Sequence, residues 1–90
     1  MPTEKYTIRY KKSVEKDLRK LPVAHVKSVV AKIIALVTDP YPNGSVKLRG
    51  SVDLFRIRHA DYRIIYRVQD EDLIIFVVKV GHRREVYRDF

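Results

Sequence analysis

Hydrophobic and polar residues alternate near the start of the chain and again in its last third. Successive side chains of a β-strand point to opposite faces of a sheet, so this alternation indicates strands with two unlike faces. Residues 5–10 predict the first strand, with Tyr6, Ile8 and Tyr10 on one face. Three further strands are predicted after Gly50, at residues 54–58, 62–68 and 73–80. The turns between these three are short, which favours antiparallel pairing.

Between these strands the apolar residues recur every three or four positions, which is the period of a helix. Ser13 is a candidate N-cap for a short helix that continues to about Lys20, and Pro22 ends it. A second helix is expected from about residue 23 to residue 38. Its apolar stripe consists of Val26, Val29, Val30, Ile33 and Val37. Residues 39–45 contain two prolines and a glycine, and they stop this helix.

The predicted order of elements is β-α-α-β-β-β, which is typical of an α+β fold. We expect a mostly antiparallel sheet with two helices packed on one face, and residues 1–90 forming a single domain. The last strand is apolar on both faces, so we place it inside the sheet. The face opposite the helices is then free to bind a partner.

Composition narrows the class of partner. The chain has 19 Lys and Arg against 11 Asp and Glu, a net charge of +8, which favours polyanions such as nucleic acid. No apolar run approaches the ~20 residues of a membrane span, and the polar start argues against a secretory signal. The absence of cysteine and three scattered histidines give no reason to expect a metal or another cofactor. A cytoplasmic location agrees with these features.

Arginines alternate with large apolar residues along the last strands. Arg56 and Arg58 are two positions apart and therefore share one face, and a tight hairpin would bring Arg63 next to Arg58. Arg83 follows the last apolar strand, and Tyr87 lies four residues further on. Four arginines and one phenol on the helix-free face would suit a phosphate backbone. The competing interpretation is that they are ordinary solvated strand residues.

Other basic residues are candidate RNA contacts, with a plain solvated surface as the competing interpretation for each. His82 is in addition a candidate for acid–base chemistry, because imidazole exchanges protons near neutral pH. The candidate RNA-binding residues are Lys47, Arg49, His82, Arg84, Lys11, Lys12, Lys16 and Lys20.

Over nearly its whole length the chain resembles the RelE toxins of bacterial and archaeal toxin–antitoxin systems. The motifs that carry the resemblance are Lys-Asp-Leu-Arg-Lys-Leu-Pro (16–22), Asp-Pro (39–40), Lys-Leu-Arg-Gly (47–50), Tyr-Arg-Ile-Ile-Tyr (62–66) and Val-Gly-His-Arg-Arg-Glu-Val-Tyr (80–87). The resemblance implies an mRNA interferase, a metal-independent endoribonuclease that cuts mRNA in the ribosomal decoding site. It also implies a cognate RelB-like antitoxin as inhibitor.

The family's catalytic positions fall on Arg56, Arg58, Arg63, Arg83 and Tyr87 of this chain. Relatives can carry lysine where this chain has Arg56 and Arg58. Because arginine keeps its proton, these two residues are expected to stabilise charge and not to act as bases. Tyr87 is our candidate base, and Arg83 would stabilise the leaving group.

Two other functions are compatible with the sequence. The ParE toxins, which inhibit DNA gyrase, resemble the same scaffold, although the terminal Glu-Val-Tyr (85–87) favours RelE. A non-catalytic RNA-binding module would need the same basic face without a base at Tyr87. A toxin that keeps the fold but has lost activity is a further possibility.

Overall fold

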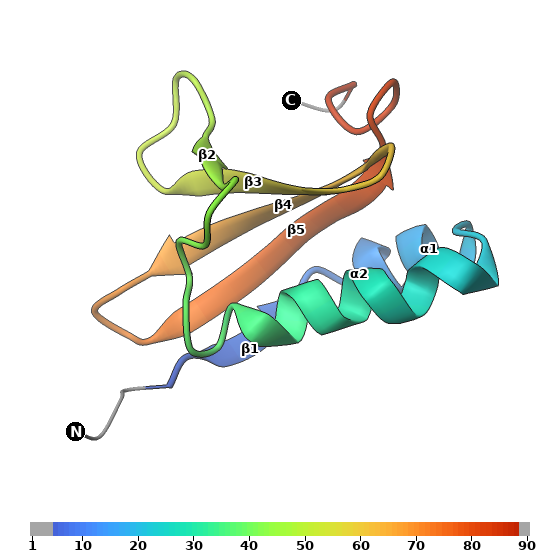
Figure 1. The fold of residues 1–90 in the computed structure, drawn as a ribbon. Coiled ribbons are helices and arrows are strands. Elements are labelled where there is room, and N and C mark those ends of the chain that lie inside the picture. Colours follow the sequence, from blue (N-terminus) through green and yellow to red (C-terminus); the bar gives the residue numbers. More distant parts are fainter. Residues whose placement is uncertain (1–4, 89–90) are drawn as a thin grey trace.

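The computed structural model describes residues 5–88 and shows a twisted sheet with two helices on one of its faces (Figure 1). The elements are β1 (Thr7–Tyr10), α1 (Ser13–Arg19), α2 (Val23–Ala35), β2 (Val46–Lys47), β3 (Leu54–His59), β4 (Tyr62–Gln69) and β5 (Ile74–His82). The predicted α+β order is confirmed, with the two-residue strand β2 added to it. Within residues 5–88, no helix is both long and apolar enough to cross a membrane.

The strands lie in the order β1-β5-β4-β3-β2. Strand β1 runs parallel to β5, with Thr7 opposite Ile74, and every other neighbouring pair is antiparallel. Strand β5 therefore lies inside the sheet, between β1 and β4, as its apolar sequence predicts. A register shift next to Ile65 and Tyr66 marks a bulge where β4 meets β5.

The hydrophobic core fills the space between the helices and one face of β3, β4 and β5. Helix α2 contributes Val29 and Ile33 to this core, while Tyr6 and Ile8 pack against it from the first strand segment. Tyr10 has the same parity but is 52% exposed, and its hydroxyl donates to Glu15. The buried members from the sheet are Ile57, Ile64, Tyr66, Val68, Ile75, Val77 and Val80.

Two helix boundaries differ from the prediction. Lys12, and not Ser13, occupies the N-cap position of α1, and no side chain caps this helix end. Helix α2 ends at Ala35, earlier than residue 38. Its continuation tightens into a turn in which the amide of Leu36 donates to Ile33 at 3.1 Å. Such i→i+3 bonds commonly finish a helix ahead of a proline-rich segment.

A tyrosine–aspartate cluster joins three segments at the end of the sheet away from the β3–β4 hairpin. The hydroxyl of Tyr6 donates to Asp70 Oδ1 at 2.6 Å, and that of Tyr41 donates to Oδ2 at 2.8 Å. These two hydrogen bonds, that of Tyr6 first, lower the pKa of Asp70 below its ordinary value. Nearby, Tyr66 donates to the carbonyl of Pro40 at 2.7 Å, and burial raises its pKa to about 12.

We expect acid to destabilise the fold partly through Asp70. A carboxylate whose pKa is lower in the folded state contributes stability above its unfolded pKa of about 3.9, and this stability is lost as pH falls through the folded pKa. Between about pH 6 and pH 2, urea unfolding should therefore show a smaller loss of stability for Asp70→Asn than for the unaltered chain. Asp72→Asn is the control, because within residues 5–88 no hydrogen bond reaches its carboxylate. Equal pH dependence in both variants would contradict the assignment.

Candidate active site

The register of three strands brings the predicted arginines together. Arg58 on β3 lies directly opposite Arg63 on β4, and Arg63 lies opposite Gly81 on β5. In the next row, Arg56 lies opposite Ile65. Directly opposite residues of antiparallel strands point to the same face, so all three arginines share one face. The alternation of the sequence is what places them there.

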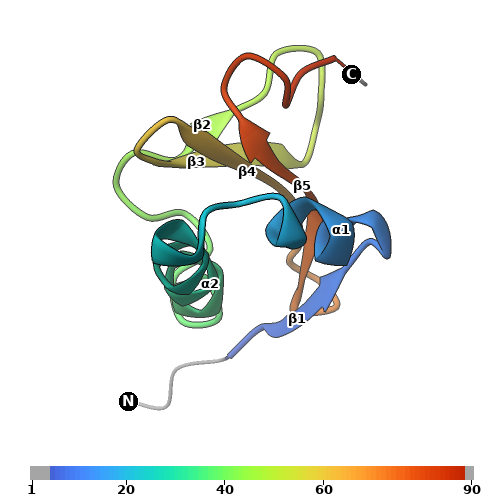
Figure 2. The ribbon, with the colours of Figure 1, turned by 90° about the vertical axis from the view of Figure 1, so that its right-hand side faces the viewer.

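That face is the one that the helices leave uncovered. Ile57 lies between Arg56 and Arg58, and Ile64 follows Arg63. Both isoleucines are buried against the helices, so the arginines point the other way. Figure 2 shows both helices on one side of the sheet, and the carboxyl-terminal turns with the segment between β2 and β3 on the other. The arginines therefore lie on the same side of the sheet as these two segments.

Arg63 is the most buried charged residue of this face, at 8% exposure. Its Nη1 donates to the carbonyls of Ala60 at 3.2 Å and Tyr62 at 3.1 Å, both in the β3–β4 hairpin. Within residues 5–88 no carboxylate forms an ion pair with it. The hairpin thus holds a positive charge in place without neutralising it.

The charges that act on Arg63 include those of the four other predicted catalytic residues. Burial is the main cause that lowers the pKa of its guanidinium, followed by the positive charges of Arg58 and Arg56, with a smaller effect from Arg83. Tyr87 acts in the opposite direction and favours the charged form. The positive charges of Arg58, Arg56 and Arg83 and the phenol of Tyr87 therefore all influence the guanidinium of Arg63. An approaching polyanion would relieve the repulsion among the cations.

Arg56 and Arg67 show how differently two arginines of one face are used. The Nε of Arg56 is buried, and no hydrogen-bond partner reaches it within residues 5–88. A buried donor without a partner is costly, and an anion would satisfy it. Arg67 lies further along β4 on the same face, and its Nε is likewise buried without a hydrogen bond within residues 5–88, but Oδ2 of Asp53 lies 3.2 Å from it and forms an ion pair. Asp53 thus partly neutralises the charge of Arg67, whereas the guanidinium of Arg56 is available to an anionic ligand.

The position of Tyr87 depends on its neighbour Val86. Val86 is fully buried, and its amide donates to the carbonyl of His82 at 2.9 Å. A Cβ added at Gly81 would lie 3.7 Å from the Cβ of Val86, so the turn packs directly over this strand end. Tyr87 follows with 39% exposure, at the border of the arginine cluster. The buried side chain of Val86 thus holds the exposed phenol of Tyr87 in position.

Arg83 contacts the β3–β4 hairpin through Asp61. Its backbone amide donates to the carbonyl of Asp61 at 2.7 Å, and its Nε is 3.8 Å from Oδ1 of the same residue. Both side chains are more than half exposed, so this ion pair contributes little and leaves the guanidinium free to move. The sequence predicts a tight hairpin here, but not that Asp61 in its turn binds Arg83. No local pattern links two residues so far apart in the chain.

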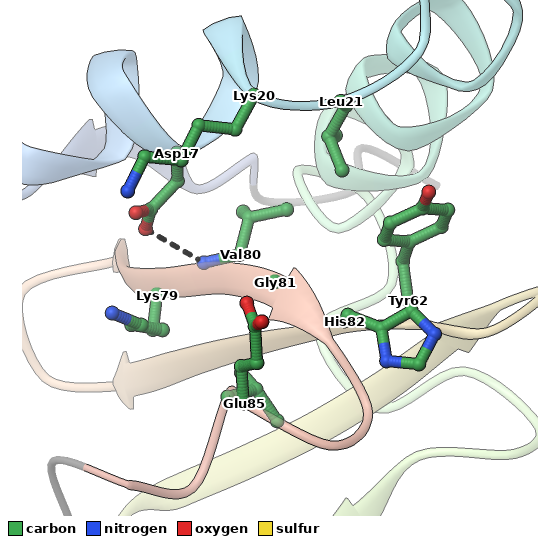
Figure 3. Close-up of a pocket in the computed structure, with 10 residues that line it drawn as sticks. Asp17, Lys20, Leu21, Tyr62, Lys79, Val80, Gly81, His82 and Glu85 are labelled. Atoms are coloured by element: carbon green, nitrogen blue, oxygen red, sulfur yellow. Dashed lines mark hydrogen bonds between the residues drawn. The ribbon is translucent and has the colours of Figure 1, made fainter.

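His82 lies apart from the arginine cluster. It is opposite Tyr62 in the sheet, one position beyond Arg63, so its side chain points to the helix side. Figure 3 shows it beside Tyr62 at a pocket that Asp17 of α1 also lines. Its Nδ1 accepts the amide of Arg84 at 3.2 Å. The structure therefore separates His82 from the other predicted groups. Strand alternation alone predicts this separation, because His82 is one position beyond Gly81, which lies opposite Arg63.

The other predicted RNA contacts are exposed but distributed around the molecule. Lys47 lies opposite Phe55, whose ring packs against the core, so the register directs Lys47 away from the face of Arg56. Arg49 lies in the segment between β2 and β3, and Arg84 in the carboxyl-terminal turns. The lysines of the α1 region are on the helix side of the sheet, namely Lys11, Lys12, Lys16 and Lys20. Their contact with RNA stays a prediction.

The family model described as the ParE toxin of the type II toxin–antitoxin system parDE matches residues 8–87. The chain is also 32% identical over 84 residues to Toxin RelG of Mycobacterium tuberculosis, covering 92% of this chain and 97% of the relative. The chain belongs to the RelE/ParE superfamily. The chain is also 32% identical over 88 residues to the mRNA interferase toxin RelE of Escherichia coli. This alignment covers 93% of this chain and 92% of the relative.

Solved structures of the RelE/ParE superfamily share the fold. The archaeal RelE–RelB complex from Pyrococcus horikoshii contains a chain with a TM-score of 0.79 and 33% identity, covering 91% of this chain and 99% of its own. The RelBE2 toxin–antitoxin complex from Mycobacterium tuberculosis gives a TM-score of 0.76 at 31% identity, covering 88% and 99%.

Proposed function

We propose that this chain is the toxin of a toxin–antitoxin pair and an mRNA interferase that cuts mRNA on the ribosome. The observation that carries the proposal is the cluster of Arg56, Arg58, Arg63 and Arg83 beside Tyr87, on the face without helices. A relative of similar length is named an mRNA interferase toxin, which supports this substrate class. Residues 1–90 would act as one domain, in the cytoplasm where ribosomes translate.

The arrangement suits cleavage by the RNA's own 2′-hydroxyl. Tyr87, as the base, accepts the proton of this hydroxyl while the 2′-oxygen attacks the adjacent phosphorus. The bond from phosphorus to the 5′-oxygen breaks, which leaves a 2′,3′-cyclic phosphate and a 5′-oxyanion, and the oxyanion takes a proton from water to become the 5′-hydroxyl. Arg56, Arg58 and Arg63 stabilise the charge that develops on the phosphoryl oxygens, and Arg83 stabilises the departing oxygen. The ribosome supplies orientation of the substrate.

The basic residues outside the cluster have a separate part in the proposal. Lys11, Lys12, Lys16 and Lys20 are exposed on the helix side, where they can hold ribosomal RNA while the opposite face reaches the mRNA. Contacts between lysines and phosphates weaken steeply with salt, so binding to the ribosome should do the same.

The proposed inhibitor is a RelB-like antitoxin. Several relatives of known structure are RelB–RelE antitoxin–toxin complexes. The net charge of +8 favours an acidic segment that orders on binding and neutralises the toxin's surface.

Inhibition of DNA gyrase is the second candidate, because the matching family model is described as a ParE toxin. In that case the same basic face would dock on a protein and cut nothing. The arginine cluster would then serve only for recognition, and the hydroxyl of Tyr87 would be dispensable.

A brief pulse of expression tests the proposal. We expect new 5′ ends of mRNA within minutes, confined to translated frames, and none when translation initiation is blocked beforehand. Gyrase trapped on broken DNA, without cleaved mRNA, would overturn the proposal in favour of the second candidate. Coexpression of the proposed RelB-like antitoxin is the control, since it should suppress the cuts.

A further inference from the structure

The edge of β3 is only half covered by its neighbour. Strand β2 is two residues long, and its pairing on β3 reaches Phe55 and Arg56. The amide of Leu48 donates to the carbonyl of Leu54 at 2.9 Å, which shows that Leu54 directs its backbone groups toward β2. Backbone direction alternates along a strand, so Arg58 directs its amide and carbonyl to the same edge. There, beyond the end of β2, the described chain offers it no strand partner.

The chain leaves this edge open because it turns away just before β2. The amide of Ser45 donates to the carbonyl of Pro42 at 2.9 Å, and Gly44 has φ of +92°, a conformation that favours glycine. The turn leaves a groove of about 340 Å³ between β3 and α2. The groove is lined by Lys32 and Ala35 of α2, by the turn residues Pro42, Asn43 and Gly44, and by Ile57 and Arg58 of β3.

The chemistry of this groove is that of an anion site. Lys32 and Arg58, two exposed cationic residues, are among the residues that line it, and strand alternation directs the backbone amide of Arg58 to the edge of β3 beside it. Asn43 adds a side-chain amide, and none of the lining residues is acidic. Arg58 also belongs to the cluster around Arg63, where it lies directly opposite that residue. The groove therefore continues the arginine cluster around the edge of the sheet.

We propose that this groove binds a second phosphate of the RNA strand, next in the chain to the phosphate held at the arginine cluster. The inference rests on the proposed function, because it takes the arginine cluster as the place of the scissile phosphate. Arg58 lies between the two positions and contacts the strand as it passes over the edge of β3. Lys32 is the residue specific to the second position, since it lies on α2 and outside the cluster.

The test is the affinity for short RNA at several salt concentrations, with 2′-O-methyl oligonucleotides that lack the attacking hydroxyl. A dinucleotide carries one internal phosphate and a tetranucleotide carries three. For the tetranucleotide, Lys32→Gln should lower the salt slope of log K by about 0.7 and weaken binding about fivefold at about 0.1 M salt, as one lost phosphate contact predicts. For the dinucleotide, Lys32→Gln should leave binding unchanged.

Lys27→Gln is the matched control, because Lys27 is exposed on the same helix and does not line the groove. Equal effects of both variants on the tetranucleotide would overturn the inference, and so would an equal loss with the dinucleotide. Weakened antitoxin binding with unchanged RNA affinity would overturn it too, and would assign the groove to a protein. Failure of the proposed function is distinguishable, because it would show as absent mRNA cleavage by the unaltered chain, whatever the binding data.

Discussion

Tyr87→Phe is expected to lower single-turnover cleavage of ribosome-bound mRNA by about 10²–10⁴-fold, the usual contribution of a positioned acid or base. The variant keeps the aromatic ring and removes only the hydroxyl. The turn that positions residue 87 should persist, because it depends on the buried side chain of Val86 and on its hydrogen bond to His82. Rapid mixing of programmed ribosomes with excess toxin measures the rate of this step.

Tyr10→Phe is the matched control for this experiment. Tyr10 is another exposed tyrosine, on β1 at the far edge of the sheet from the arginine cluster, and its hydroxyl bonds to Glu15. We expect its cleavage rate to stay within about threefold of the unaltered chain, as for a surface change. If Tyr87→Phe also stayed within this range, Tyr87 would not be the base.

Arg63→Gln is expected to lower the same rate by about 10²–10³-fold, the typical cost of removing one preorganised donor. The guanidinium is nearly buried, held by two carbonyls and free of any carboxylate in the described structure, so it keeps its full charge for the substrate. Its loss should also relieve repulsion with Arg58 and Arg56. The melting temperature of the variant should therefore equal or exceed that of the unaltered chain.

Arg67→Gln serves as the control, because Arg67 is on the same strand and face but is paired with Asp53. Its cleavage rate should change by less than about threefold. Similar losses for both variants would mean that the face acts only through its total charge. A large drop in melting temperature for Arg63→Gln would instead indicate that the residue mainly supports the hairpin.

These two predictions follow from one feature of the fold. Like charges on adjacent strands repel each other and destabilise a sheet. The pair Arg58 and Arg63 is directly opposed, and the buried Nε of Arg56 lacks a partner in the described chain. A protein that retains such costs at one site commonly does so for function. In our proposal, the charge of the phosphate, or of an acidic antitoxin, offsets them.

Local patterns in the sequence predict the two helices, the main strands and the face of the sheet that carries the arginines. Helical period and strand alternation are local, so the sequence alone predicts that Arg56, Arg58 and Arg63 share the helix-free face of the sheet. The local pattern failed where a boundary depends on long-range contacts. Strand β2 is an example, since two residues carry no period and form a strand only because β3 is beside them.

How distant segments meet depends on the tertiary structure. Pairing of β4 with β5 placed Gly81 opposite Arg63, and Val86 then folded over that strand end and brought Tyr87 to the cluster. The attachment of Arg83 to Asp61 and the open edge of β3 arise in the same way. The physical reason is that side-chain direction follows from neighbouring residues, whereas strand register follows from the packing of the whole sheet.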